Sequence, residues 1–294
     1  MRRWRHRTHL AGLCAALAAA CGPAAHPRDR SITIVDAAGR TVSLAGPARR
    51  IVSLFPSFTE LLFAVGAGER VVGRTAWCDY PPAARAVPNV GDGIPPNVEV
   101  VAARRPDLVV LYHSGPNVVA ARQLEQLGIA AVLVDLNLLE DLGPAARVLG
   151  RLTGRVAAGD SLAAALDSVA HAALPPPVTS LAFVVWDNPP IVIGAGSYLD
   201  RLAALAGARN VFHDLTAPSA QVSLEAIAHR DPRFVAVLDD LAADPAFAAR
   251  PEWQAVAAVR ERRFLTLAGG LFGRPGPRTA EAVRRLRSLI EAAP

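Results

Sequence analysis

A motif that occurs twice is the feature of this 294-residue sequence that most restricts its fold. In each copy a Glu stands seven residues before a Pro, and the Pro is followed by an apolar stretch. The first copy contains Glu99 and Pro106, and the second contains Glu225 and Pro232. Because repetition of this kind marks structural units that share one arrangement, the sequence predicts two similar lobes.

Apolar runs typical of strands alternate with helix-like segments on both sides of these repeats. A small hairpin that turns at Gly39 is expected over residues 31–43. Strands are predicted at 50–54, 71–75, 108–112, 131–136, 181–186, 234–237 and 263–266, and helices at 58–65, 98–103, 118–127 and 278–292. Strands that alternate with helices form parallel sheets, so an α/β fold is predicted.

Two further segments, 57–71 and 197–211, resemble each other. Each begins with a Ser suited to cap a helix and continues through an apolar-faced helix to a small residue and a valine. Ser57 and Ser197 are therefore expected as helix caps. This second repeat supports the prediction of two similar lobes.

Residues 139–177 separate the two groups of strands. They are rich in Ala and Leu, show no strand pattern and end in three prolines. We interpret them as one long connecting helix. The predicted fold class is thus α/β, with two Rossmann-like lobes with parallel sheets at 31–138 and 178–294 joined by one long backbone helix.

The N-terminus has the pattern of an exported protein. Several arginines precede an uncharged apolar run at residues 10–20, which indicates a signal peptide over 1–20. The run is shorter than the roughly 20 residues that a membrane-spanning helix needs. Small residues lead directly into Cys21, as at a bacterial lipoprotein processing site, so Cys21 is the predicted lipidation site and 21–30 the linker. Ordinary cleavage near Ala20 is the alternative.

This pattern predicts a mature chain in the periplasm or on the outer face of the cytoplasmic membrane, where the lipid anchor attaches it to the membrane. Of the three cysteines, only Cys78 would then remain as a thiol, which excludes a framework of disulfides within the chain. The fold must therefore be stabilised by its apolar core.

Charge and motifs argue against two other classes of protein. The net charge is +5, but four of the positive charges are arginines of the signal peptide. No stripe of arginines interleaved with aromatic residues is present, so nucleic acid is not an expected partner. The sequence also contains no G-x-x-x-x-G-K, G-x-S-x-G or H-E-x-x-H motif. We therefore expect a protein that is not an enzyme and has no cofactor or protein-bound metal.

Several short motifs recur in the order and spacing of a known family. They are Arg50-Ile51-Val52-Ser53-Leu54, Pro56-Ser57, Thr59-Glu60-Leu61, Asp79-Tyr80-Pro81-Pro82, Pro106-Asp107-Leu108-Val109, Gln221-Val222-Ser223-Leu224-Glu225 and Gly276-Pro277-Arg278. Together they resemble the class III periplasmic binding proteins of ABC importers, which have a rigid helical backbone and serve the uptake of cobalamin, haem and iron siderophores. The Asp79-Tyr80-Pro81-Pro82, Asn188-Pro189-Pro190 and Gln221-Val222-Ser223 segments are most similar to the cobalamin-binding branch.

The resemblance implies a docking role for Glu99 and Glu225. In the family, one exposed Glu on each lobe meets arginines of the two permease subunits, and such contacts are charge-assisted and often bidentate. The partner would be the permease dimer of an ABC importer, with the binding protein itself a monomer. The alternative is that each Glu is a first-turn helix carboxylate that interacts favourably with the helix dipole.

The ligand is expected between the lobes, in loops that follow the carboxyl ends of the strands. Several residues in these loops are aromatic, which suits a broad and partly apolar ring ligand. The predicted ligand-binding residues are Trp77, Tyr80, Asp92, Gly93, Ile94, Tyr112, His113, Trp186, Asn188, Pro190, Ser219, Phe272 and Arg274. The resemblance implies that they capture cobalamin or a related corrinoid, or another metal chelate.

Alternatives remain open for individual residues and for the ligand. Tyr80 could instead pack beside its neighbouring prolines, and Trp186 could belong to the core. A haem ligand would need an axial residue, for which Tyr112, His113 or His213 has suitable chemistry. A ferric siderophore is a further alternative, and a sensory or enzymatic protein on the same scaffold is another.

Overall fold

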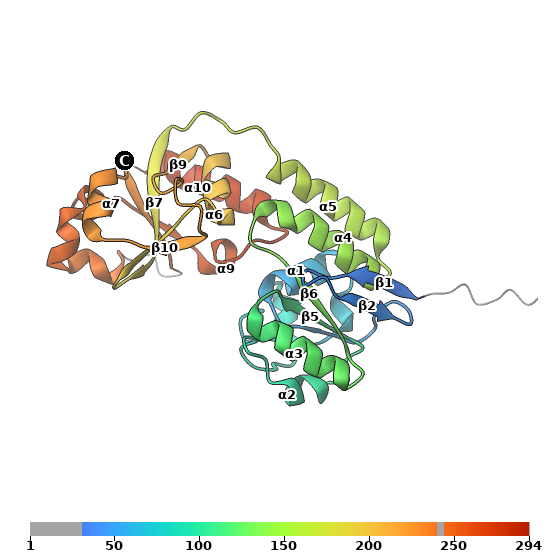
Figure 1. Ribbon diagram of the computed structural model, residues 1–294. Coiled ribbons are helices and arrows are strands. Elements are labelled where there is room, and N and C mark those ends of the chain that lie inside the picture. The colour runs from blue at the N-terminus through green and yellow to red at the C-terminus, as the bar shows by residue number, and fades with distance from the viewer. Residues whose placement is uncertain (1–30, 240–243, 294) are drawn as a thin grey trace, which may run out of the picture. The chain divides into compact units, whose positions relative to one another are not determined.

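The computed structural model describes residues 31–239 and 244–293, and its N-terminal lobe is built on a four-stranded parallel sheet (Figure 1). The strands, in spatial order, are β4 (Val71–Arg74), β3 (Ile51–Ser53), β5 (Leu108–Tyr112) and β6 (Ala130–Val134). Every residue of β3 is buried, as are the first four of β5. Near-continuous burial is expected when both faces of a parallel sheet are covered, and apolar clusters lie on its two faces.

Short helices follow the strands of this lobe, as the alternating pattern predicts. They are α1 (Pro56–Ala64), α2 (Val98–Ala102) and α3 (Gly115–Gln126), with the 3-10 turns η1 (Gly68–Arg70) and η2 (Pro82–Ala86). The hairpin of β1 (Ile32–Val35) and β2 (Thr41–Leu44) precedes them and turns at Gly39, whose φ of 73° favours glycine.

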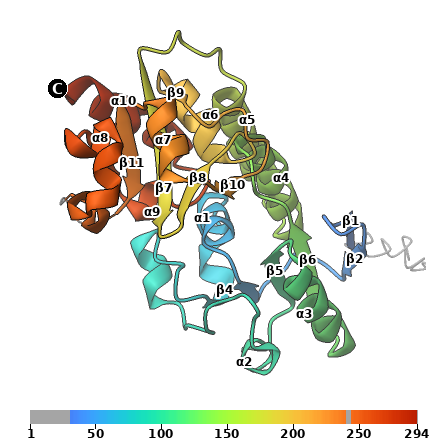
Figure 2. The ribbon, with the colours of Figure 1, turned by 60° about the vertical axis from the view of Figure 1, so that its left-hand side comes forward.

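The predicted long backbone helix is wrong in detail, because residues 139–177 form two helices rather than one. The turn η3 (Leu139–Asp141) leads into α4 (Leu142–Leu152), and α5 (Val156–Ala170) follows after a break. Gly154 has a φ of 67° in that break, a left-handed conformation that ends α4 and reverses the chain. The two helices lie side by side in both ribbon views (Figure 2). Residues 171–178 then continue without helix to the next strand.

The C-terminal lobe contains a mixed six-stranded sheet. Its strands are β7 (Thr179–Asp187), β8 (Pro190–Ile193), β9 (Ala208–Asn210), β10 (Ser219–Gln221), β11 (Phe234–Leu238) and β12 (Phe264–Leu267). β9 and β11 pair with β7 in parallel, and β12 pairs with β11 in the same sense. β8 pairs antiparallel with β7, from which it returns directly through a tight turn, and β10 pairs antiparallel with β8. The sequence pattern missed β8, β9 and β10, which are only three or four residues long.

The helices of this lobe pack against both faces of the sheet, where two apolar clusters form. They are α6 (Tyr198–Leu205), α7 (Leu224–Arg230), α8 (Ala257–Arg260), α9 (Gly269–Phe272) and α10 (Thr279–Ala292), with 3-10 turns η4 (Ala246–Ala249) and η5 (Pro251–Ala255). The two-lobed α/β fold class is confirmed.

Of the two serines expected as helix caps, Ser197 caps its helix and Ser57 does not, and the repeated motif supplies two further caps. The side chains of Asn97, Ser197 and Ser223 accept hydrogen bonds from backbone N–H groups of the first turns of α2, α6 and α7. Ser57 does not cap α1: the helix begins at Pro56, Phe55 is the N-cap, and Ser57 is buried within the first turn. The proline at the first helical position, whose fixed φ suits a helix start, shifts the beginning of α1 ahead of the serine.

The predicted signal peptide, linker and lipidation site at Cys21 lie outside the described residues. Within residues 31–239 and 244–293, no helix combines the length and apolar character needed to span a bilayer. Cys78 is a buried free thiol.

Candidate ligand-binding and docking sites

The segment between β4 and η2 presents two aromatic side chains to solvent, and we call residues 77–80 the aromatic loop. Trp77 is 64% exposed and Tyr80 39% exposed. Between them Cys78 is fully buried, with its Sγ 3.1 Å from Oγ1 of Thr75. Cys78 therefore anchors the loop in the N-terminal lobe, while the aromatic rings remain available for contact with a ligand.

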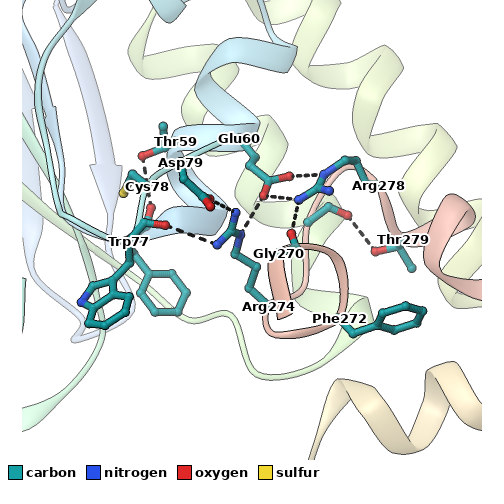
Figure 3. Close-up of polar contacts among 12 residues, drawn as sticks. Thr59, Glu60, Trp77, Cys78, Asp79, Gly270, Phe272, Arg274, Arg278 and Thr279 are labelled. Carbon is teal, nitrogen blue, oxygen red and sulfur yellow. Dashed lines mark hydrogen bonds and ion pairs between the residues drawn. The ribbon is translucent and has the colours of Figure 1, made fainter. Parts of the chain in front are cut away.

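Four charged side chains beside this loop form an ionic cluster, which comprises Glu60, Asp79, Arg274 and Arg278 (Figure 3). Glu60 lies on α1 with 1% of its side chain exposed. Its Oε1 accepts hydrogen bonds from Nε of Arg274 at 2.8 Å and from Nη2 of Arg278 at 2.7 Å. Its Oε2 accepts a third from Nε of Arg278 at 2.9 Å. A buried carboxylate needs such partners to offset the cost of its desolvation.

The ionic cluster joins the two lobes, because both arginines follow β12 in the chain. Arg274 also donates from Nη2 to Oδ1 of Asp79 at 2.5 Å and from Nη1 to the Trp77 carbonyl at 3.3 Å. Cζ of Arg278 lies 3.8 Å from the centroid of the Tyr80 ring, in cation–π geometry. Three residues of the aromatic loop are thus contacted from the C-terminal lobe.

Hydrogen bonds and charges in the ionic cluster shift the pKa values of Asp79 and Arg274. Burial raises the pKa of Asp79, but the hydrogen bond and the charge of Arg274 outweigh it, so the pKa lies below its usual value. Burial lowers the pKa of Arg274, and the hydrogen bonds to Glu60 and Asp79 reverse that effect and raise it. Both groups are therefore ionised at neutral pH, as the ion pair requires.

Three predicted ligand residues are largely buried in the structure, and each has contacts with other parts of the protein. Phe272 is 1% exposed and packs in an apolar cluster of the C-terminal lobe. Gly93 is also buried, with a φ of 92°, and a Cβ there would lie 2.8 Å from the Leu54 carbonyl oxygen. Its lack of a side chain is explained by this close backbone approach. Arg274, with 12% of its side chain exposed, pairs with two carboxylates of the protein, those of Glu60 and Asp79.

Tyr112 and His113 lie at the carboxyl end of β5, as predicted. The Tyr112 hydroxyl donates to Oδ1 of Asn137 at 2.5 Å, and its ring stacks on Phe55 with centroids 5.1 Å apart. Burial and the nearby charge of Asp135 raise the pKa of Tyr112. Nδ1 of His113 lies 2.9 Å from Oδ1 of Asp135, which orients the imidazole.

The end of β7, next to the turn into β8, carries a further exposed aromatic group. Trp186 is 59% exposed, and its Nε1 donates to the Asn188 carbonyl at 2.8 Å. The alternative that Trp186 belongs to the core is therefore wrong. Asn188 is exposed and Pro190 is half-buried in the same turn.

The remaining predicted ligand residues are Asp92 and Ile94, on a loop, and Ser219, at the start of β10. Asp92, Ile94 and Ser219 are exposed, with Ile94 at 47%. His213, one of the possible axial ligands, has 72% of its side chain exposed and pairs through Nδ1 with Asp200 at 2.8 Å. Among the described residues, no group of three or more His, Cys, Asp or Glu side chains is arranged to hold a metal ion.

Sequence reasoning gave no role to Glu60, Asp79 or Arg278, although all three stand in the motifs that carry the family resemblance. The one available signal of this cluster was Glu60, the single charged residue in the sequence of α1. Its partners are more than 200 residues away along the chain, so no local pattern could reveal them.

Both predicted docking residues are exposed, and both stand at the second position of a capped helix. Glu99 lies on α2 and Glu225 on α7. Hydrogen bonds from its own backbone N–H and from Ser223 lower the pKa of Glu225, so it is ionised. Exposure is required for docking, and the first-turn position is equally favourable for a carboxylate at the positive end of a helix.

Comparison with known proteins places this architecture in a family. Residues 51–269 match the model of the periplasmic binding protein family, well over half of the chain. The chain therefore belongs to the periplasmic binding proteins, as its motifs indicated.

Individual relatives include proteins with different ligands in their names. A vitamin B12-binding protein of Pectobacterium carotovorum subsp. carotovorum is 28% identical over 250 residues, which are 83% of this chain and 89% of the relative. An uncharacterized ABC transporter substrate-binding lipoprotein of Bacillus subtilis, YvrC, is 29% identical over 298 residues, covering 95% and 94% of the two chains. The solved structure of the periplasmic heme-binding protein BhuT with two hemes is 27% identical with a TM-score of 0.70, and the match covers 83% of this chain and 98% of that one.

Proposed function

We propose that this chain captures cobalamin or a related corrinoid outside the cytoplasmic membrane and delivers it to an ABC importer. The observation that carries the proposal is the exposure of Trp77 and Tyr80 on the loop after β4 and of Trp186 at the end of β7. Exposed aromatic rings of this size suit the flat, partly apolar face of a corrin. Membership of the periplasmic binding proteins and the similarity to vitamin B12-binding relatives support the same ligand.

Direct titration tests the ligand. The purified mature chain is titrated with cyanocobalamin, cobinamide, haemin and a ferric siderophore, and binding is followed by calorimetry and absorbance. We expect saturable binding of the corrinoids without a large shift of their spectra, because no side chain need replace a cobalt ligand. Replacement of Trp77 or Trp186 by Ala should weaken that binding. Saturation by haemin or siderophore alone would contradict a corrinoid ligand.

For delivery, we propose that Glu99 and Glu225 dock on the permease dimer. The similar position of Glu99 and Glu225 in the two lobes supports this docking role. Each Glu stands two positions after a capping residue and is exposed at the start of a helix. A carrier with two similar lobes can present equivalent carboxylates to two permease subunits, where charge-assisted contacts with arginines fix its orientation.

The docking role is tested by separating uptake from binding. The double variant Glu99→Ala with Glu225→Ala should abolish uptake through the importer and leave ligand affinity unchanged. Glu281→Ala with Glu291→Ala is the matched control, because these glutamates are exposed on α10 and should not affect uptake. Normal uptake by the Glu99 and Glu225 double variant would refute docking and leave these residues only their favourable interaction with the helix dipole.

Haem is the second candidate, and one feature of the site favours it. Tyr112, whose hydroxyl lies at the end of β5, is accompanied by His113, and both have axial-ligand chemistry. The similarity to the heme-binding protein BhuT supports this candidate. If haemin binds, Tyr112→Phe and His113→Ala identify the axial ligand through the loss of its Soret shift.

The location of the mature chain is proposed from its N-terminus and its family. Export and acylation of Cys21 would hold it at the outer face of the cytoplasmic membrane, close to the permease. Labelling with a fatty-acid analogue tests the anchor: the label should enter the chain and be lost in Cys21→Ala. Equal labelling of both chains would refute the site.

A further inference from the structure

We propose that Arg274 is a positioning residue, which holds the aromatic loop of the N-terminal lobe in its binding orientation from the C-terminal lobe. The inference rests on the proposed function, because it takes Trp77 and Tyr80 as ligand contacts. It differs from a ligand-binding role for Arg274 itself, and the two make different predictions.

Arg274 contacts a buried anchor on α1 and the aromatic loop that it holds in place. The anchor is Glu60, whose carboxylate is almost fully buried on α1 and receives Nε of Arg274 at 2.8 Å. In the aromatic loop, the Asp79 carboxylate accepts a hydrogen bond from Nη2 of Arg274, and the Trp77 carbonyl accepts one from Nη1. Figure 3 shows the guanidinium between these three acceptors, with the Trp77 indole directed away from it. A planar guanidinium with donors in a fixed fork suits such a three-way contact.

Arg278 completes the anchor from the same segment. It binds both oxygens of Glu60 and donates from Nη2 to the Gly270 carbonyl at 2.5 Å. Its guanidinium also covers one face of the Tyr80 ring. Arg278 therefore keeps Glu60 paired even when Arg274 is replaced, so that a substitution at 274 releases the loop without leaving a buried carboxylate alone.

On its other side the aromatic loop is held by its own lobe. Cys78 is buried against Thr75, and Nε of Arg85 donates to the Asp79 carbonyl at 3.0 Å. With the backbone restrained from both lobes, the Trp77 and Tyr80 rings stay exposed in a fixed position. A ring held in place before binding loses less conformational entropy when a ligand arrives.

A double-mutant cycle on cyanocobalamin affinity tests the mechanism. Arg274→Met should weaken binding about 10-fold, the equivalent of roughly 1.4 kcal/mol. In a background with both Trp77→Ala and Tyr80→Ala the same substitution should have almost no further effect, because positioning acts through the aromatic rings of the loop. Equal loss in both backgrounds would show that Arg274 contacts the ligand directly and would overturn the proposal.

A measurement without ligand separates this inference from the ligand assignment. Hydrogen exchange of the backbone amides of residues 75–80 should be at least several-fold faster in Arg274→Met, and Arg274→Lys should restore only part of the protection. The control is Arg147→Met, which removes an Arg–Asp pair between α4 and α5. Unchanged exchange in Arg274→Met would overturn the proposal, even if cyanocobalamin binds. Faster exchange would support the positioning of the aromatic loop by Arg274, even if the wild-type chain binds none of the four ligands.

Discussion

At the scale of single residues, the most consequential group is the buried carboxylate of Glu60. It sits on an apolar helix, where an unpaired charge would be strongly unfavourable, and two arginines from a distant segment neutralise it. Its pairing therefore ties the stability of the N-terminal lobe to a segment of the other lobe. Surface pairs in the same protein lack this property because solvent screens them.

Removal of this carboxylate should be costly. Glu60→Ala leaves Arg274 and Arg278 without their common partner, and we expect the free energy of unfolding to fall by about 3 kcal/mol. Urea denaturation followed by circular dichroism measures the change. Asp167→Asn, which weakens the partly exposed pair with Arg147, should cost less than about 1 kcal/mol. Similar losses in the two variants would contradict a special role for Glu60.

Asp79 should make stability depend on pH in the acidic range. Its pKa is lower in the folded chain than in the unfolded chain, so its ion pair with Arg274 stabilises the fold above the usual pKa of about 4. That contribution is lost as the pH falls through the lowered value. The difference in urea midpoint between wild type and Asp79→Asn should therefore be greatest near neutral pH and shrink in acid. A difference that stays constant down to pH 2 would exclude this linkage.

At the scale of elements, glycines determine how α4 and α5 pack. A Cβ at Gly159 would lie 2.9 Å from both the Ala146 carbonyl oxygen and Cα of Gly150. The helices therefore approach closely at this point, and the break at Gly154 allows α5 to turn back along α4. The helix pair takes the place of the single backbone helix that the Ala- and Leu-rich composition suggested.

This packing predicts an effect opposite to helix propensity. In an isolated helix, Ala in place of Gly is favourable by about 1 kcal/mol. Gly159→Ala should nevertheless destabilise the protein, because its Cβ meets backbone atoms that cannot move independently. Thermal unfolding measures the change, and Ala164→Gly on the exposed side of α5 is the control, expected to cost about 1 kcal/mol through propensity alone. A higher melting temperature for Gly159→Ala would refute close packing.

At the scale of the whole molecule, several contacts connect the two lobes besides the ionic cluster. The Tyr198 backbone N–H donates to the Asn137 carbonyl at 3.0 Å, while its hydroxyl donates to the Phe272 carbonyl within the C-terminal lobe. Arg201 donates to the Ala170 carbonyl, which links α6 to the end of α5. Burial strongly raises the pKa of Tyr198, so that its hydroxyl keeps its proton and remains a donor.

These connections predict little hinge motion. Small-angle X-ray scattering of the mature chain, with and without saturating cyanocobalamin, should give nearly the same radius of gyration. Release of the ionic cluster in the double variant Arg274→Met with Arg278→Met should allow a larger difference. A marked compaction of the wild-type chain on ligand addition would instead indicate closure about a flexible hinge.

The sequence by itself determined the two-lobed α/β fold and the family. Strand and helix patterns act over a few residues, and the repeated motif around Glu99 and Glu225 is read without any tertiary information. Local chemistry also predicted the cap at Ser197, because it serves the adjacent turn. For the same reason, Trp77 could be located on a loop between elements and Trp186 at the end of a strand.

Only the tertiary structure decided which charged and aromatic groups meet. Glu60 and Arg274 are far apart in the sequence, and no periodicity links them. Arg274 was expected to face a ligand, and in the structure it also connects the two lobes through Glu60. Phe272 and Gly93 were placed by packing against distant elements, and the pairing of α4 with α5 depended on a close glycine contact. Long-range packing and burial of charge depend on how the chain folds back on itself, and this is the physical reason that local patterns could not reveal them.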